Sequence, residues 1–81
     1  MTRKEKYEEI KAKLEDVSNR EMLKKIQEDA IKNKELGVDF HRKRLEVYMN
    51  DLTNEEKTVS IKESDFDISV KYFEKLFNTQ S

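Results

Sequence analysis

Cysteine and proline are absent from this 81-residue sequence, and glycine and histidine each occur once. A chain without cysteine forms no disulfide bond and offers no thiolate to a metal ion. Nucleophilic catalysis needs a histidine beside a serine or cysteine, yet the one histidine, His41, lies beside an apolar helical ladder, and the sequence has no glycine-rich phosphate loop. We therefore expect no enzymatic activity, no cofactor and no metal site.

Long apolar runs are also missing from the sequence. None approaches the roughly 18–20 residues that span a bilayer. The N-terminal segment MTRKEKYEEI lacks the apolar centre of a signal peptide. These absences predict a cytoplasmic protein that does not enter a membrane.

Neither sign of charge dominates, since 17 basic residues stand against 18 acidic ones and the net charge is −1. The chain is therefore not a polycation of the kind that holds nucleic acid by bulk electrostatics. Only 35% of the residues are hydrophobic and 43% are charged, which is lean for a domain of this size. We expect one small domain, residues 1–81, whose limited core favours docking on another protein or forming a homodimer.

Apolar side chains recur at helical spacing in several segments, and they predict an all-α fold, a small bundle of about four helices. Tyr7, Ile10 and Leu14 form a narrow apolar seam on a charged rod. Leu45 and Tyr48 begin a ladder that faces one side of a later helix. The expected helices are residues 3–16, 19–36, 39–52 and 65–78.

Helix ends have to be identified from capping residues, because proline and glycine are so scarce. A serine or threonine followed three residues later by an acid predicts a capping box. The pairs with this spacing are Thr2–Glu5, Ser18–Glu21, Thr53–Glu56, Ser60–Glu63 and Ser64–Asp67, of which Ser60–Glu63 lies too close to Ser64 to start a separate helix. Around the second pair, Val17 and Met22 occupy the positions of a hydrophobic staple. Gly37 is expected to end the second helix with a positive φ, and Asp39 to cap the third.

Two patterns overlap near the C-terminus. Residues 59–61 and 66–72 alternate between apolar and polar side chains, as in strands. Phe66, Val70, Phe73 and Phe77 also recur at helical spacing over a longer span, and for that reason we prefer a helix, with residues 59–62 as an extended lead-in. The alternative is an α+β fold in which two N-terminal helices pack on a small antiparallel sheet that includes residues 45–49.

Aromatic and aliphatic side chains are the candidate contacts for a partner protein. A lean chain with surplus aromatics is expected to leave apolar surface exposed, and tyrosine and phenylalanine are residue types that anchor interfaces. Tyr72 and Ile68 lie off the main apolar face of the last helix, so this helix is either covered on two sides or exposes one apolar side. The residues expected at the contact are Tyr7, Ile10, Leu14, Tyr72, Phe73 and Phe77.

The sharpest local feature is the basic run Arg42, Lys43 and Arg44. Consecutive residues point around most of a helix, so they do not line one groove. One interpretation is a solvated shoulder paired with acids such as Asp39 and Glu46. The other is a contact with phosphates or with an acidic partner, with Phe40 or Tyr48 nearby for stacking, in which the cations form the polar rim.

These patterns together predict a non-enzymatic protein–protein interaction module, a regulator, inhibitor or adaptor that acts on another protein. Its size and composition would fit an accessory protein of a phage or other mobile element that acts on a host factor. The alternative is a nucleic-acid-binding protein that uses the basic third helix, whose binding would weaken steeply with salt.

Overall fold

The computed structural model describes residues 2–53 and 61–78. Their elements, in order, are α1 (Arg3–Glu15), a short 3-10 helix η1 (Val17–Asn19), α2 (Arg20–Lys32), α3 (Val38–Thr53) and α4 (Glu63–Asn78). The predicted all-α fold with four α-helices is confirmed, and the described ranges contain no strand. The α+β alternative is wrong for this part of the chain, since residues 45–49 and 66–72 are helical; residues 59 and 60 of the expected lead-in lie outside it.

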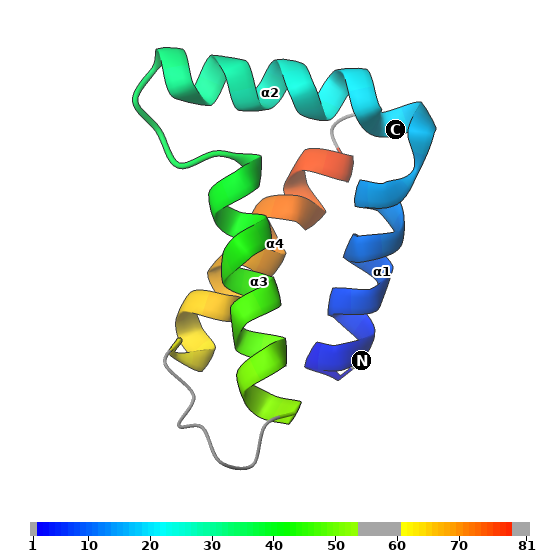
Figure 1. The fold of residues 1–81 in the computed structure, drawn as a ribbon, viewed down its shortest axis with the longest axis vertical. Helices are drawn as coiled ribbons and strands as arrows, with labels where there is room; N and C mark the ends of the chain where they lie inside the picture. The colour runs from blue at the N-terminus through cyan, green and yellow to red at the C-terminus, as the bar shows by residue number, and fades with distance from the viewer. Residues whose placement is uncertain (1, 54–60, 79–81) are drawn as a thin grey trace.

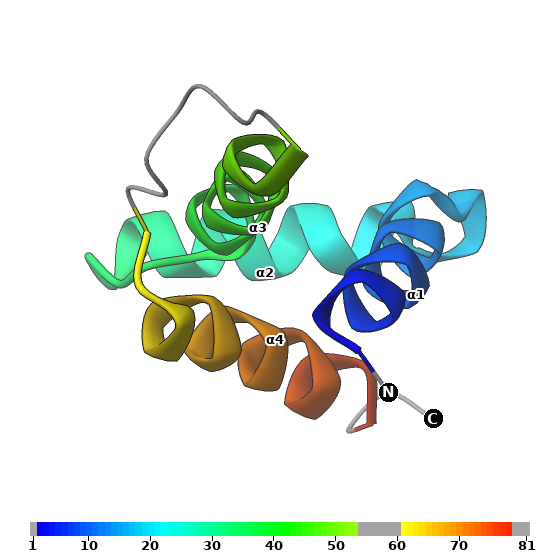
Figure 2. The same ribbon diagram turned by 90° about the horizontal axis from the view of Figure 1, so that it is seen from below.

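Helix α4 is the element on which the others are assembled. It forms the most extensive helix pair with α3 and packs on α1 as well. Figure 1 shows α1 and α3 running along the long axis of the molecule, with α2 lying across one end of both. Seen from below in Figure 2, α4 underlies α1 and α3. The core therefore lies between α4 and the two helices above it.

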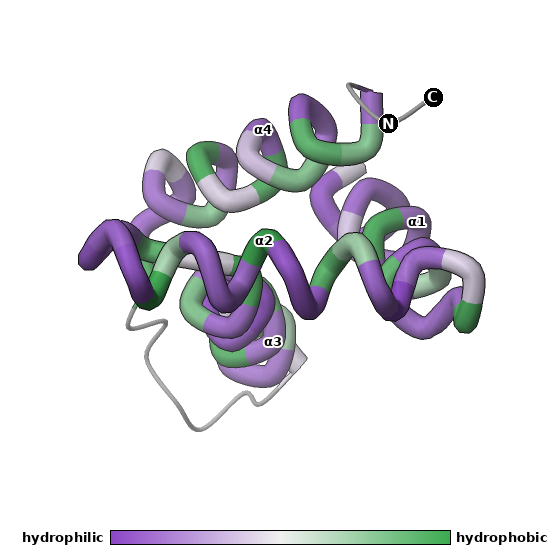
Figure 3. The backbone as a smooth tube through the Cα atoms, turned by 90° about the horizontal axis from the view of Figure 1, so that it is seen from above, coloured by the Kyte–Doolittle hydropathy of each residue, from purple (hydrophilic) through white to green (hydrophobic). Residues whose placement is uncertain are grey.

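The core takes side chains from all four α-helices. Helices α2 and α4 are clearly amphipathic, and Figure 3 shows hydrophobic bands separated by hydrophilic ones along both. The ring of Tyr48 stacks on that of Phe66 with the centroids 4.3 Å apart, which joins α3 to α4. The buried apolar residues are Ile10, Ala30, Val38, Leu45, Tyr48, Phe66, Val70, Phe73 and Leu76.

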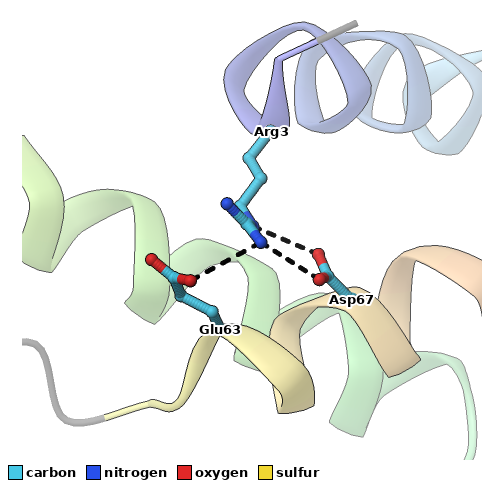
Figure 4. Close-up of polar contacts among 3 residues, drawn as sticks. All are labelled: Arg3, Glu63 and Asp67. Carbon is cyan, nitrogen blue, oxygen red and sulfur yellow. Dashed lines mark hydrogen bonds and ion pairs between the residues drawn. The ribbon is translucent and has the colours of Figure 1, made fainter.

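The start of α1 matches its prediction and is tied to α4. The backbone N–H of Glu5 donates to Thr2 Oγ1 at 3.1 Å and that of Thr2 donates to Glu5 Oε1 at 3.2 Å, so the first capping box is confirmed. Figure 4 shows Arg3 reaching across to the first turns of α4. Its guanidinium donates to both carboxylate oxygens of Asp67, at 3.2 and 3.1 Å, and lies 3.7 Å from Glu63.

The capping box predicted for Ser18 and Glu21 is wrong. Ser18 lies inside η1, and the cap is Asp16, whose Oδ1 accepts the N–H of Ser18 at 2.9 Å and its hydroxyl at 2.8 Å. These two hydrogen bonds lower the pKa of Asp16. Asp16 therefore caps η1, while the N-cap residue of α2 is Asn19, which makes no side-chain cap hydrogen bond. The staple is wrong too, because Val17 is 72% exposed.

Gly37 does not have the role predicted for it. Helix α2 already ends at Lys32, and the residue with positive φ, at 58°, is Lys34. A Cβ atom at Gly37 would lie 2.6 Å from Gln27 Oε1 and 2.7 Å from Ala30 Cβ. Glycine is required here because the backbone passes directly against α2.

Two further caps were assigned to the wrong residue. Helix α3 begins at Val38, so Asp39 lies in its first turn, where its N–H donates to Gln27 Oε1 at 3.0 Å. Helix α4 begins at Glu63, so Ser64 is helical, and the N–H groups of Asp65 and Phe66 both donate to the carbonyl of Lys62. The pair Thr53–Glu56 extends outside the described residues.

Candidate protein-interaction surface

The six residues predicted for a protein contact do not form one surface. Ile10 and Phe73 lie in the core, with 5% and 0% of their surface exposed. The others are partly buried and pack against that core: Tyr7, Leu14, Tyr72 and Phe77. The seam on α1 therefore faces inward, and a partner that meets the folded chain does not reach Phe73.

The basic run is divided among different environments. Arg42 Nε donates to Glu46 Oε1 at 3.3 Å across one turn of α3, as the interpretation of a solvated shoulder expects. Arg44 turns instead toward α4, where its Nη1 donates to Ser69 Oγ at 3.3 Å. Lys43 is exposed, and no acceptor or carboxylate within residues 2–53 and 61–78 pairs with it. The three cations thus do not act as one patch.

Arg44 is held at the seam between α3 and α4. Besides Ser69, its Nη1 donates to the backbone carbonyl of Asp65 at 3.3 Å. Its guanidinium carbon lies 4.6 Å from the centre of the Phe40 ring, in cation–π geometry. Both hydrogen bonds, at 3.3 Å, are slightly longer than the usual range for N–H···O, so they orient the side chain more than they stabilise the fold.

Beside Arg44 lies a shallow hollow of about 360 Å³. Its lining joins the outer side of α3 to the residues that start α4. The lining residues are Phe40, Lys43, Arg44, Val47, Ile61 and Asp65, here called the Phe40 surface. Phe40 is 41% exposed, and Val47 and Ile61 are partly exposed, so the hollow presents aromatic and aliphatic surface under two cations.

A buried histidine adjoins this surface. His41 is 6% exposed; its Nδ1 lies 2.9 Å from the hydroxyl of Ser69, and its ring stacks on Tyr72 at 4.1 Å. Because Ser69 Oγ already accepts from Arg44, its own hydrogen is free to be donated to Nδ1 of neutral His41. Burial, and then the charge of Arg44, lower the pKa of His41, while burial and Glu35 raise the pKa of Tyr72.

The exposed apolar side chains outside the Phe40 surface are dispersed. They are Val17, Ile31, Leu36, Leu52 and Ile68. Isolated apolar residues are common on the surfaces of soluble proteins and indicate no site by themselves. The two alternatives expected for α4 both occur, since His41 covers Tyr72 while Ile68 is 54% exposed.

A second groove, of about 520 Å³, lies where the end of α1 meets α2 and α3. Its apolar floor includes Leu23 and Val38. The charged residues around it are Glu15, Asp16, Arg20, Lys24, Glu28, Asp39 and Arg42. Among the described lining residues four are acidic, three are basic and none is aromatic, so this groove lacks the aromatic anchor that is common at protein interfaces.

Serine and histidine side chains pair in the interior of the fold, between Ser69 and His41. Ser69 is fully buried against His41, so a substrate outside the folded chain does not contact its hydroxyl. Within residues 2–53 and 61–78 no three histidine, aspartate or glutamate side chains gather in a metal-binding cluster. In the same ranges no helix combines the length and hydropathy that a bilayer crossing requires.

The sequence places Phe40 beside the basic run, but the rest of the Phe40 surface was not predicted, although a signal for part of it exists. Phe40, Lys43, Arg44 and Val47 recur at i, i+3, i+4 and i+7, which is one stripe of a helix. This stripe lies beside the ladder that begins at Leu45, and two of its four members are charged, so hydrophobic periodicity selected the ladder alone. Ile61 carries no helical signal, because only the tertiary fold brings it to this stripe.

The structure defines a small all-α protein with aromatic, aliphatic and cationic side chains around one shallow hollow. Comparison of the chain with protein-family models, curated proteins and solved structures finds no match.

Proposed function

We propose that this protein is a non-enzymatic, cytoplasmic interaction module that regulates or bridges another protein through the Phe40 surface. The single observation that carries the proposal is Phe40 itself, an aromatic side chain 41% exposed over an apolar hollow. Anchors of protein interfaces are enriched in aromatic residues and arginine, and here both types are adjacent.

The contact residues proposed here differ from those that the sequence pattern favoured. Tyr72 remains close to the surface through His41, whose ring contacts Phe40 at 5.4 Å and Tyr72 at 4.1 Å. Lys43 and Arg44 remain as the polar rim. Arg42 lines the other groove and is paired with Glu46, so it is left out.

Nucleic-acid binding by α3 is the competing function. Proteins that bind nucleic acid normally align several cations on one face, because each neutralised phosphate adds to affinity. Here Arg42 and Arg44 belong to different grooves, and this separation favours a protein partner.

A capture experiment from the cell of origin, combined with light scattering, tests the proposal. Tagged wild-type protein and two variants, Phe40→Ala and Leu36→Ala, are cross-linked in lysate and compared by mass spectrometry. Leu36 is the matched control because it is 58% exposed and does not line the hollow. We expect a defined protein to be captured by the wild type and by Leu36→Ala but not by Phe40→Ala; equal capture by all three would reject the Phe40 surface.

A further inference from the structure

Four residues of the Phe40 surface form one stripe along α3, and the order of their side chains is informative. Phe40 and Val47 lie at the two ends, with Lys43 and Arg44 between them. The apolar residues line the hollow of about 360 Å³, and Ile61 closes it from the other side. A ligand that fills the hollow therefore lies directly against two cations.

The guanidinium of Arg44 has unused hydrogen-bonding capacity. Both of its protein hydrogen bonds come from Nη1, and within the described ranges no acceptor is recorded for Nε or Nη2. Arginine presents its donors as a planar fork that matches the two oxygens of a carboxylate. Contacts with Phe40, Asp65 and Ser69 already orient this fork, so little conformational entropy remains to be lost on binding.

The positive charges of the Phe40 surface are not neutralised by ion pairs among the described residues. None of the ion pairs recorded within residues 2–53 and 61–78 involves Lys43 or Arg44. Asp65 lines the same hollow but offers Arg44 only its backbone carbonyl. Among the described residues, the lining carries two basic side chains and one acidic one, a formal charge of +1 on a protein whose formal net charge is −1.

We propose that the Phe40 surface recognises an acidic peptide segment of the partner protein, with a carboxylate on Arg44 and Lys43 and a neighbouring apolar side chain in the hollow. The inference rests on the proposed function and specifies the chemistry of the partner. Phosphates of a nucleic acid fit less well, because a single arginine and a single lysine beside an apolar hollow give too small a footprint. A second copy of the chain fits less well, because two like surfaces each carry net positive charge.

The probe is a peptide library displayed on phage, selected on the immobilised wild-type protein. We expect the enriched sequences to place glutamate or aspartate next to an aliphatic or aromatic residue. The best peptide is then synthesised with its acid and with the isosteric amide. Removing the charge should weaken binding about tenfold or more, the size of a lost charge-assisted hydrogen-bonded pair.

Variants of the protein identify which cations contact the carboxylate of the peptide. Arg44→Gln and Lys43→Gln should each weaken the binding of the acidic peptide and leave the affinity for the amide peptide unchanged. Arg42→Gln is the matched control, since Arg42 lies on the same helix but outside the hollow. Lys43 has no role in the described fold, so its variant keeps the test valid even if Arg44→Gln melts early.

Each other outcome has a definite meaning. Peptides that bind the Phe40 surface without an acid would overturn the inference and leave the proposed function standing. Selection of no peptide at this surface would also overturn it, and the lysate capture decides the proposed function separately. If the protein binds single-stranded DNA at low salt and Arg44→Gln abolishes this binding, the surface is assigned to nucleic acid instead. If light scattering shows a dimer that Phe40→Ala abolishes, the surface is assigned to a second copy of the chain.

Discussion

Replacing Gly37 by alanine should destabilise the protein, and the structure sets the size of the effect. Removing a glycine restricts the unfolded chain, which alone would stabilise the fold by about 0.4–1 kcal/mol. Against this, the new methyl group would lie 2.7 Å from Ala30 Cβ and 2.6 Å from Gln27 Oε1. Overpacking of this kind costs about 1–3 kcal/mol. The clash should prevail, because Ala30 Cβ is attached to the helix backbone and does not rotate away.

Chemical denaturation of wild type and Gly37→Ala measures the difference, and a melting curve should shift down by roughly 4–8 °C for each kcal/mol lost. A double-mutant cycle identifies the cause. In an Ala30→Gly background, the cost of Gly37→Ala should become smaller, because the opposing methyl group is gone.

Lys34 provides the converse test. Its φ of 58° is costly for a residue with a side chain, so Lys34→Gly should be neutral or stabilising by up to about 1 kcal/mol. The reasoning would be refuted if Gly37→Ala were as stable as the wild type, or if its cost were unchanged in the Ala30→Gly background.

Three other predictions concern the core, the histidine and the α1–α4 ion pair. Phe66→Ala removes a ring with 0% exposure and should lower the free energy of unfolding by about 3–5 kcal/mol. This is a large part of the roughly 4–12 kcal/mol of total stability expected for a chain of this length. An unchanged denaturation midpoint would contradict the described core. Because burial lowers the pKa of His41 below its ordinary 6.5, the unfolded state takes up a proton first. The contribution of neutral His41 to the free energy of unfolding should be fully present above about pH 6.5 and should decline as the pH falls toward the pKa of His41 in the folded state. Urea titrations at several pH values measure this decline, and it should be absent in His41→Gln. Arg3→Met should lower the melting temperature at low salt and have less effect in about 1 M NaCl, where the pairing with Asp67 is screened; a salt-independent loss would indicate that packing, not charge, is responsible.

Helix content and the main apolar faces were predictable from the sequence because both depend on local spacing. Leu45 and Tyr48 face the core as their periodicity indicates, and Phe66, Val70 and Phe73 do the same on α4. The capping box of Thr2 and Glu5 was also predictable, since both of its hydrogen bonds form within four consecutive residues. For the last helix, a longer helical pattern prevailed over a shorter alternating one.

The helix ends that were assigned wrongly depend on competing or distant groups. Ser18 does not cap α2, because η1 intervenes and Asp16 accepts both the N–H and the hydroxyl of Ser18. Gly37 is required by Ala30 and Gln27, which lie in the preceding helix. No local rule includes that clash, so the rule for helix-ending glycine was applied at the wrong residue.

The sequence alone determined which segments are helical and which side of α3 and α4 is apolar, because those properties repeat along the chain. Only the tertiary structure decided which aromatic residues remain accessible, burying Phe73 while leaving Phe40 beside Arg44 and Ile61. The physical reason is that burial depends on which faces meet, and α4 has apolar side chains on more than one face. A surface built from two helices is therefore set by their packing and not by the periodicity of either one.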